Sequence, residues 1–439
     1  MLQKRVLVVL VVIAIVGAGF VGCSRGADEQ AQGAEEGEQI TLEVLHYLDL
    51  ADNTSSGNFE ELVDAFHESN PDIRLEFDYL FNEPYHNKLQ SSAIAGQLPD
   101  AVFLWPGKRT GEVTGSGAVQ DLRPWIEDMD AEFAPAALAP QGPNGEIWEL
   151  PEQVTATHVM FTNDRLLDEL GLEFPETLDE LIAQGEVIRE AGYIPIAMDN
   201  GDGWQMQSTL LSALVERTGG REWMNRARVG EARFSDPEFV EAVEVIKTLS
   251  DNEMFSPGVN QAAYGQALTD FVTEKAVYFI DGGWRTSNLT GEMTEEQYEY
   301  VSYNVFPELP TERGQAGSTA VVAGTGFGMN AELEGAEADA AWEWIYFFAG
   351  PEGSAIKAEQ GWLPAVKIDL PADSPVLTVK LSEFLNSTPG GYVIDAVMDA
   401  EGMGVLHPLL QEMMFGNVTP QEVGDRYEEW VAANDSSRS

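Results

Sequence analysis

The chain has 439 residues, and its 24 Lys and Arg stand against 74 Asp and Glu, giving a formal net charge of −50. A field of this sign repels nucleic acids and anionic lipid headgroups, which excludes both as partners. The hydrophobic content of 44% predicts a folded protein, and the length favours two lobes over one core. The acidic residues are spread along the chain, so we interpret them as a solvated, halophilic type of surface and not as a cation-capturing cluster.

The N-terminus has the layout of an export signal. Two basic residues precede the apolar run 6–21, which is shorter than the roughly 20 residues that a membrane-spanning helix needs. Cys23, the one cysteine, follows a small residue at the end of this run, as in a bacterial lipoprotein signal. We therefore expect residues 1–22 to be cleaved and Cys23 to carry a lipid, which leaves no disulfide; an uncleaved anchor is the alternative. Residues 23–38 are small, polar and acidic, which predicts a flexible tether.

The next 67 residues alternate between strand and helix patterns. Apolar and polar side chains alternate over 40–47 and again over 73–79, and each run predicts a strand. Asn58 and Glu61 have the spacing of a capping box that opens a helix. A helix at about 84–95 and an apolar strand at 101–105 follow. This rhythm predicts an α/β lobe with a mainly parallel sheet.

The rhythm restarts near residue 151. Thr177 and Glu180 have capping-box spacing and predict a helix to about residue 191. Later patterns predict strands at 194–198, 276–280, 318–322 and 327–329, helices at 239–249 and 340–349, and a mostly helical stretch to about residue 433. No flexible linker separates the two α/β regions, which predicts two closely coupled lobes with a cleft between them.

Three tryptophans follow predicted strands directly. Trp105 ends one strand, and Trp204 and Trp284 come after glycines that let the backbone turn tightly. In open α/β sheets, ligands bind at the carboxyl ends of strands. Indole rings suit the C–H faces of pyranose sugars, and polar side chains nearby can bind hydroxyl groups. The candidates for this polar role are Asp199, Asn200, Gln205, Asp281 and Arg285.

Patterns for catalysis and metal binding are weak by comparison. There is no G-x-S-x-G nucleophile motif, and the five histidines have no metal-ligand spacing, so we expect neither a metal nor a cofactor. Residues 324–328 are glycine-rich like a phosphate-binding loop, but Met329 stands where the next glycine would be and no Walker lysine follows. We interpret them as a turn between strands. The 74 acidic residues leave a glycosidase carboxylate pair open, because any pairing is available.

Several motifs together resemble family 1 extracellular solute-binding proteins, which capture sugars for ABC importers. The order and spacing of the motifs along nearly all of the chain after the signal carry the resemblance. They are Gly96-Gln-Leu-Pro-Asp100, Gly145 to Pro151, Asn163 with the segment Thr177–Leu181, Phe271 to Trp284, Ala341 to Glu352 and Gly361 to Ala365. Glu274 and Leu178 depart from the residues usual at their positions in the family.

The resemblance implies a fold and a set of site residues. The fold would be α/β and two-lobed, of the periplasmic-binding-protein-like type II, with hinge crossovers and a cleft. Lobe one would hold residues 39–150 and 307–355, and lobe two 152–305 and 358–435, with hinges near 151, 305–307 and 355. Trp284 matches the tryptophan that stacks on sugar in the family. Trp362, Tyr47, Asp49 and Gln153 are further candidates implied by their positions.

The sequence thus predicts a lipid-anchored, extracytoplasmic, monomeric receptor that closes on a carbohydrate, with an oligosaccharide favoured over a monosaccharide. The expected partners are ABC permease subunits and, through Cys23, a membrane. Two alternatives stay open: an exported polysaccharide-active enzyme, and a cation or polyamine receptor of the same fold. The enzyme would need two carboxylates at a defined separation in the cleft.

Overall fold

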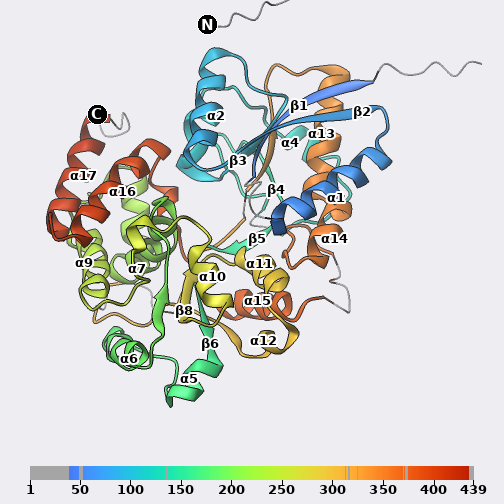
Figure 1. The fold of residues 1–439 in the computed structure, drawn as a ribbon. Helices are drawn as coiled ribbons and strands as arrows, with labels where there is room; N and C mark the ends of the chain where they lie inside the picture. Colours follow the sequence, from blue (N-terminus) through green and yellow to red (C-terminus); the bar gives the residue numbers. More distant parts are fainter. Residues whose placement is uncertain are drawn as a thin grey trace, which may run out of the picture. The chain divides into compact units, whose positions relative to one another are not determined.

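Two β-sheets organise the chain from Gln39 to Ser439, which forms one compact unit in this computed structural model (Figure 1). The structure describes residues 39–48, 53–134, 137–311, 313–314, 317–323, 325–368, 370 and 374–434. The predicted signal, Cys23, the tether and Asp49 lie outside these residues. We call each sheet, with the helices packed on it, a lobe.

The sheet of lobe one has the strand order β2-β1-β3-β11-β4. Its strands are β1 (Ile40–Tyr47), β2 (Ile73–Leu80), β3 (Ala101–Leu104), β4 (Leu150–Pro151) and β11 (Gly326–Met329). β1 pairs in parallel with β2 and β3, whereas β11 runs antiparallel to β3, with Phe327 opposite Phe103. The predicted parallel arrangement is therefore confirmed for the first three strands.

Helices from two distant parts of the chain cover this sheet. They are α1 (Asn53–Ser69), α2 (Glu83–Ala95), η1 (Gly107–Thr110), α3 (Gly111–Gly115), α4 (Arg123–Ile126), α13 (Gly335–Ala349) and α14 (Pro351–Glu359). Figure 1 shows the orange α13 beside the blue strands, although the two are far apart in sequence. α13 buries Trp344 against Phe66 of α1 and Phe327 of β11, which ties the late segment to the early one.

The sheet of lobe two has the order β7-β8-β6-β9, with β6 (Val159–Asn163), β7 (Ile194–Ala197), β8 (Ala276–Asp281) and β9 (Val301–Asn304). The first helices around it are α5 (Asp164–Leu170), α6 (Leu178–Glu190), the π-helical η2 (Met206–Leu211), α7 (Ser212–Thr218), α8 (Gly220–Arg228) and α9 (Pro237–Asp251). The later ones are η3 (Val259–Gln261), α10 (Gln266–Val272), α11 (Arg285–Glu292), α12 (Glu295–Glu299), α15 (Val376–Ser387), η4 (Ile394–Ala396), α16 (Ala400–Met414) and α17 (Pro420–Asn434).

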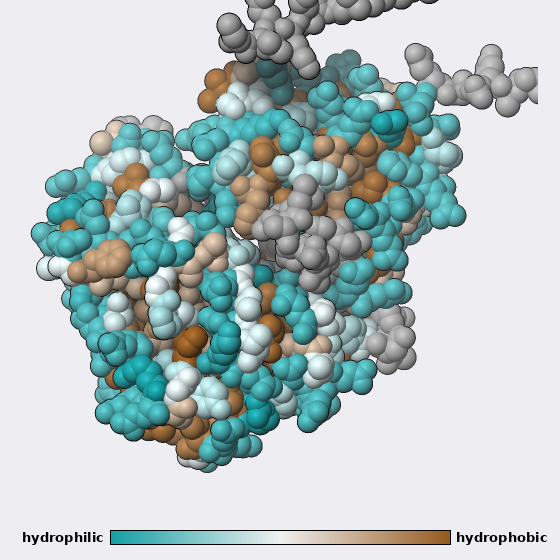
Figure 2. Space-filling view, in the orientation of Figure 1, coloured by the Kyte–Doolittle hydropathy of each residue, from teal (hydrophilic) through white to brown (hydrophobic). Residues whose placement is uncertain are grey.

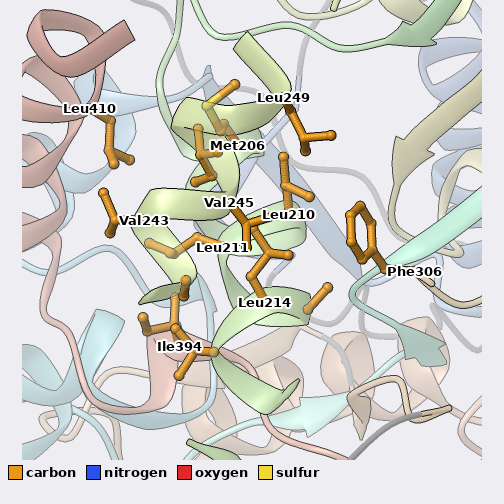
Figure 3. Close-up of a cluster of buried hydrophobic side chains, with 14 of the residues drawn as sticks. Met206, Leu210, Leu211, Leu214, Val243, Val245, Leu249, Phe306, Ile394 and Leu410 are labelled. Atoms are coloured by element: carbon orange, nitrogen blue, oxygen red, sulfur yellow. The ribbon is translucent and has the colours of Figure 1, made fainter. Parts of the chain in front are cut away.

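Apolar side chains are concentrated inside the lobes. The face seen in Figure 2 is largely hydrophilic, with hydrophobic residues in scattered patches. In lobe two, Figure 3 shows side chains of η2, α7 and α9 gathered with residues from distant segments, namely Phe306, Ile394 and Leu410. The C-terminal helices α16 and α17 pack on α9 and on each other, so the end of the chain completes this core.

Three stretches of chain connect the lobes. The first runs from β4 into β5 (Val154–Ala156), and the second joins β10 (Val321–Ala323) to β11. β5 and β10 form an antiparallel pair, with Thr155 opposite Val322. The third stretch follows α14, and its Pro364 bridges to Gln153. The three connections therefore lie side by side.

Two of these connections differ from the predicted positions. Phe306 is buried in the core of lobe two, and Thr319 donates to the carbonyl of His158 in the same lobe, so the chain does not cross at 305–307. Residue 355 lies inside α14, which packs on α1 and α13 of lobe one. The crossings come later, after Ala323 and after Ile368, which still packs against the core of lobe one. An apolar strand pattern does not reveal which sheet the strand joins, and this caused the displacement.

The two predicted capping boxes had different outcomes. Thr177 accepts from the backbone N–H of Glu180, whose carboxylate accepts from the N–H of Thr177, so the box that opens α6 is confirmed. The box at Asn58 is wrong, because α1 already begins at Asn53 and Asn58 lies inside the helix. Residues 53–57, which precede Asn58, are small and polar. They contain no apolar residues at helical spacing, so the sequence did not indicate that the helix begins there.

Candidate functional site

A cavity of about 670 Å³ lies between elements of the two lobes. This volume is within the range of about 300–1,000 Å³ that is usual for small-molecule sites. Ten Phe, Tyr and Trp side chains from lobe one, lobe two and the connection between them line much of it. They are Tyr47, Phe59, Phe81, Phe103, Trp105, Trp204, Tyr264, Trp284, Phe348 and Trp362. The cavity thus offers ring faces from both lobes.

The rings of lobe one are held by edge contacts at the ends of β1 and β3. Trp105 meets Tyr47 edge-on, with centroids 4.8 Å apart and planes at 83°, and meets Tyr85 at 5.6 Å. Tyr47 donates its hydroxyl to Oδ1 of Asn82 at 2.9 Å. Oγ1 of Thr110 donates to the carbonyl of Trp105 at 2.6 Å, which fixes the backbone after the strand. These contacts hold the ring faces in place before any ligand arrives.

The rings of lobe two form a connected group. Trp204 lies 4.6 Å from the ring of Tyr264 and 6.1 Å from that of Trp284, centroid to centroid. Nε1 of Trp284 donates to the hydroxyl of Tyr264 at 3.0 Å. The predicted clustering of strand-end tryptophans is therefore observed for Trp105, Trp204 and Trp284, which all line one cavity.

Glycines before Trp204 and Trp284 are required by close approach. Gly203 has φ +81°, and a Cβ on it would lie 2.2 Å from Cγ of His407 in α16. A Cβ on Gly282 would lie 2.2 Å from the ring of Trp284. No other residue fits at either turn without moving these rings, so both glycines help to place the tryptophans.

Asp281 and Gln205 support the cavity wall from behind and do not line it. Nε of Arg285 donates to Oδ2 of Asp281 at 2.8 Å, and Nε2 of Gln205 donates to the same oxygen at 3.0 Å. The guanidinium of Arg285 lies 3.7 Å from the ring centroid of Tyr264 and reaches the cavity. Burial raises the pKa of Asp281, and Arg285 acts in the opposite direction. The ion pair with Asp281 holds the guanidinium of Arg285 against the ring of Tyr264.

Asp199 and Asn200 also have supporting contacts. The carboxylate of Asp199 accepts from the N–H groups of Gly265 and Ala267 at 2.9 Å, at the start of α10, and burial raises its pKa to about 6. The carbonyl of Asn200 contacts Nε2 of His407 and accepts from Gln411, both at 2.9 Å, and its side chain donates to Asn260. Neither residue lines the cavity, because these polar groups anchor loops to α10 and α16.

Two candidates lie in the connections between the lobes. Gln153 is buried and lines the cavity beside Trp362, whose N–H donates to the carbonyl of Lys357. Next to them, Nζ of Lys357 donates to Oε2 of Glu152 at 3.1 Å and to the carbonyl of Phe348 at 2.6 Å. Burial lowers the pKa of Lys357 and raises that of Glu152, and the pair opposes both changes.

Sequence reasoning missed most of the lining residues, among them Phe81, Tyr264, Arg109 and Asp395. Phe81 follows β2, and the strand-end criterion applied to Trp105 would have found it. Tyr264 precedes a helix, and Arg109 and Asp395 lie in short 3₁₀ turns, where no sequence pattern marks them. Nη1 of Arg109 lies 3.6 Å from Oδ2 of Asp395, so this ion pair joins lobe one to lobe two.

The site offers no metal centre within the described part of the chain. No group of three or more His, Cys, Asp or Glu residues there could hold an ion. His46 and His86 lie beside the cavity, and burial lowers the pKa of the first to about 3 and of the second to about 2. Both imidazoles are therefore neutral at pH 7.

Among the described residues, no helix has both the length and the apolar character needed to cross a membrane.

The chain is similar to carbohydrate-binding proteins in sequence. It is 20% identical to the "Multiple sugar-binding protein" of Streptococcus mutans over 254 residues, which cover 56% of this chain and 58% of that protein. It is also 20% identical to the "Melibiose/raffinose/stachyose-binding protein MelE" of Bacillus subtilis, with 87% of each chain covered. The alignments to the first two curated relatives span little more than half of their lengths.

Solved structures share the fold. A chitin oligosaccharide binding protein superimposes with a TM-score of 0.80 at 20% identity, covering 90% of this chain and 99% of the other. The raffinose complex of RafE gives a TM-score of 0.70 at 17% identity, covering 91% and 100%. The predicted two-lobed type II fold is therefore confirmed.

A family profile gives the assignment. The profile described as "Bacterial extracellular solute-binding protein" matches residues 51–355, which is more than half of the chain. That family consists of extracytoplasmic binding proteins and not of enzymes. This chain belongs to the bacterial extracellular solute-binding protein family.

Proposed function

We propose that this protein is a receptor that captures a carbohydrate, with an oligosaccharide favoured, for an ABC importer. The observation that carries the proposal is the set of aromatic rings that both lobes present to one cavity. Ring faces stack on the C–H faces of pyranoses, and a cavity of about 670 Å³ offers room for more than one ring. Sequence relatives named for sugar binding support the same class of ligand.

Trp284, Trp204, Trp105 and Trp362 are the proposed stacking groups, with Tyr47 beside them. Gln153 and Arg285 are the proposed hydrogen-bonding groups, because both line the cavity. Asn200, Gln205 and Asp281 take a supporting role in the proposal, since their side chains contact the loops behind the rings. The mechanism requires no cofactor.

Lobe closure is the proposed mode of capture. The two lobes, approximately residues 39–150 with 326–368 and 154–323 with 374–434, would rotate about the three adjacent connections. A ligand held by rings from both lobes interacts fully with the closed form alone, so its binding shifts the equilibrium towards closure. The closed form would be recognised by the permease subunits, with the receptor acting as a monomer.

A lipid on Cys23 is the proposed attachment to the membrane, with residues 24–38 as a tether. The full chain expressed in a bacterium with lipoprotein processing should partition into the detergent phase on Triton X-114 separation. Cys23→Ser should move it to the aqueous phase. Detergent partitioning of the Ser variant equal to that of the wild type would contradict the lipid anchor.

The carbohydrate proposal is tested by thermal shift on residues 39–439. We expect one or more of a panel of mono- and oligosaccharides to raise the melting temperature by a few degrees. A ligand at a hundred times its Kd adds about 2.7 kcal/mol. Trp284→Ala should abolish this shift, because it removes a cavity ring and the hydrogen bond to Tyr264. Trp125→Ala is the matched control, since Trp125 stacks on Trp342 outside the cavity.

The control should lower the melting temperature of the free protein while keeping the sugar-induced shift. No shift with any sugar, combined with stabilisation by spermidine or calcium, would contradict the carbohydrate proposal. Sugar products appearing over time with the purified protein would instead indicate an enzyme.

A further inference from the structure

The cationic side chains around the cavity form ion pairs with carboxylates of the protein itself. Three cations approach it, and each lies within ion-pair distance of a carboxylate. The pairs are Arg109 with Asp395 at 3.6 Å, Lys357 with Glu152 at 3.1 Å and Arg285 with Asp281 at 2.8 Å. Glu292, also in the lining, is exposed on α11 and has an interaction of its own within the protein. His46 in the lining is neutral at pH 7, since burial lowers its pKa to about 3.

These ion pairs are buried to an extent that makes them costly to break. Side-chain exposure is 7% for both members of the Lys357–Glu152 pair, and 3% and 0% for Arg285 and Asp281. Arg109 is 8% and Asp395 16% exposed. Separating such a pair leaves an uncompensated charge in a poorly solvated place. A charged ligand entering the cavity would have to take a partner from one of these pairs or remain unpaired itself.

The Arg109–Asp395 pair is the one whose two members come from different lobes and both line the cavity. Nε and Nη2 of Arg109 lie 3.2 and 3.0 Å from Nε2 of His86, and its guanidinium is 5.8 Å from the ring centroid of Trp105. Asp395 accepts from Oγ of Ser208 at 2.9 Å, in the π-helical turn that follows Trp204. The pair thus lies between the ring groups of the two lobes.

We infer that the cavity selects an uncharged carbohydrate, rejecting uronic acids and amino sugars, and that Arg109 and Asp395 determine this selectivity. The inference rests on the proposed carbohydrate function. A neutral sugar gains stacking area and hydroxyl hydrogen bonds without disturbing any of the three pairs. A uronate would compete with Asp395 for Arg109, and an amine would compete with Arg109 for Asp395.

The test measures matched ligands by isothermal titration on residues 39–439, which contain every cavity residue. Cellobiose is compared with cellobiouronic acid, in which one primary hydroxyl is oxidised to a carboxylate. N,N′-diacetylchitobiose is compared with chitobiose, whose amines are free. We expect a neutral member to bind at least about tenfold more tightly than its charged counterpart. Equal or tighter binding of a charged member would overturn the inference and leave the carbohydrate proposal standing.

Two substitutions then test the pair itself. Asp395→Asn leaves Arg109 without its carboxylate, so the affinity for the uronic acid relative to the neutral sugar should rise by about tenfold. Arg109→Gln should raise the relative affinity for the amino sugar instead. The ratio within one variant is used because it cancels any effect of the substitution on lobe closure. Ratios that stay at the wild-type value in both variants would overturn the role of this pair.

Glu190→Gln is the matched control, because it removes one carboxylate from the exposed end of α6 away from the cavity lining. Its ratios should equal those of the wild type. A rise as large as that of Asp395→Asn would assign the effect to the net charge of the chain and overturn the role of the pair. If neither these probes nor any sugar of the thermal-shift panel binds the wild type, the carbohydrate proposal fails together with this inference.

Discussion

His46 shows how a titratable residue is accommodated beside the cavity. Its ring is stacked on Phe103, with centroids 4.9 Å apart, and meets Phe59 edge-on at 4.5 Å. Phe327 and Phe348 contact it at 5.2 and 6.0 Å. In this aromatic enclosure, burial lowers the pKa from 6.5 to about 3. The folded protein therefore holds a neutral imidazole, whereas in the unfolded chain this imidazole takes up a proton with its ordinary pKa of 6.5.

We predict that the unfolding free energy of His46→Phe, relative to that of the wild type, is higher at pH 5 than at pH 8. Because the folded pKa lies below the unfolded one, wild-type stability from this group is complete above about pH 6.5 and is lost as the pH falls towards 3. At pH 5 the loss is on the order of 2 kcal/mol. Urea unfolding of the wild type and of His46→Phe at pH 5 and pH 8 measures this loss. A difference in unfolding free energy that is the same at pH 5 and pH 8 would contradict the prediction.

At the scale of elements, α6 illustrates local signals that determine a boundary. Thr177 and Glu180 satisfy backbone N–H groups reciprocally at the first turn, and Glu180 also accepts from the N–H of Glu176 at 2.8 Å. On the inner face of the helix, Leu181 and Ile188 are buried in the core of lobe two. The cap sets where the helix starts, and the apolar face sets how it packs.

Thr177→Ala should destabilise the protein by about 1 kcal/mol, because it removes an N-cap hydroxyl. Thr177→Ser keeps the hydroxyl and should lose much less. Chemical unfolding followed by circular dichroism compares the two variants. A loss from the serine variant equal to that from the alanine variant would show that the methyl group of Thr177, and not the cap, stabilises the helix.

For the molecule as a whole, charge is the dominant electrostatic feature. The formal net charge of −50 produces self-repulsion that disfavours the compact state, and salt screens it. Figure 2 shows a largely hydrophilic face, in agreement with a solvated surface. Much of the acidity has no basic counterpart, since Lys and Arg number 24 against 74 acidic residues.

We therefore predict that the melting temperature of residues 39–439 rises as NaCl increases from 0.1 to 2 M. Most of the screening is reached once the Debye length falls to about 3 Å, near 1 M. Scanning calorimetry at several NaCl concentrations measures this rise. Equal melting temperatures at low and high salt would contradict the halophilic interpretation of the surface.

The sequence by itself determined the fold class and most of the elements. Strong alternation in residues 40–47 and 73–79, and the capping box at Thr177, are local signals that the tertiary structure did not override. The strand-end positions of Trp105, Trp204 and Trp284 predicted aromatic ligand-binding positions, because ligands bind at the carboxyl ends of strands. Trp204 and Trp284 follow strands of one sheet and Trp105 follows a strand of the other, so the packing of the two lobes brings the three rings to one cavity.

Only the tertiary structure decided which sheet each late segment joins and which polar groups face the cavity. Phe306 and Thr319 remain with lobe two because they find partners there, which no periodicity reveals. Asp281 is turned away from the cavity by its contacts with Arg285 and Gln205, whereas Arg109 and Asp395 meet from opposite lobes. Pairings between residues distant in the chain depend on the packing of whole elements, and a local pattern does not encode them.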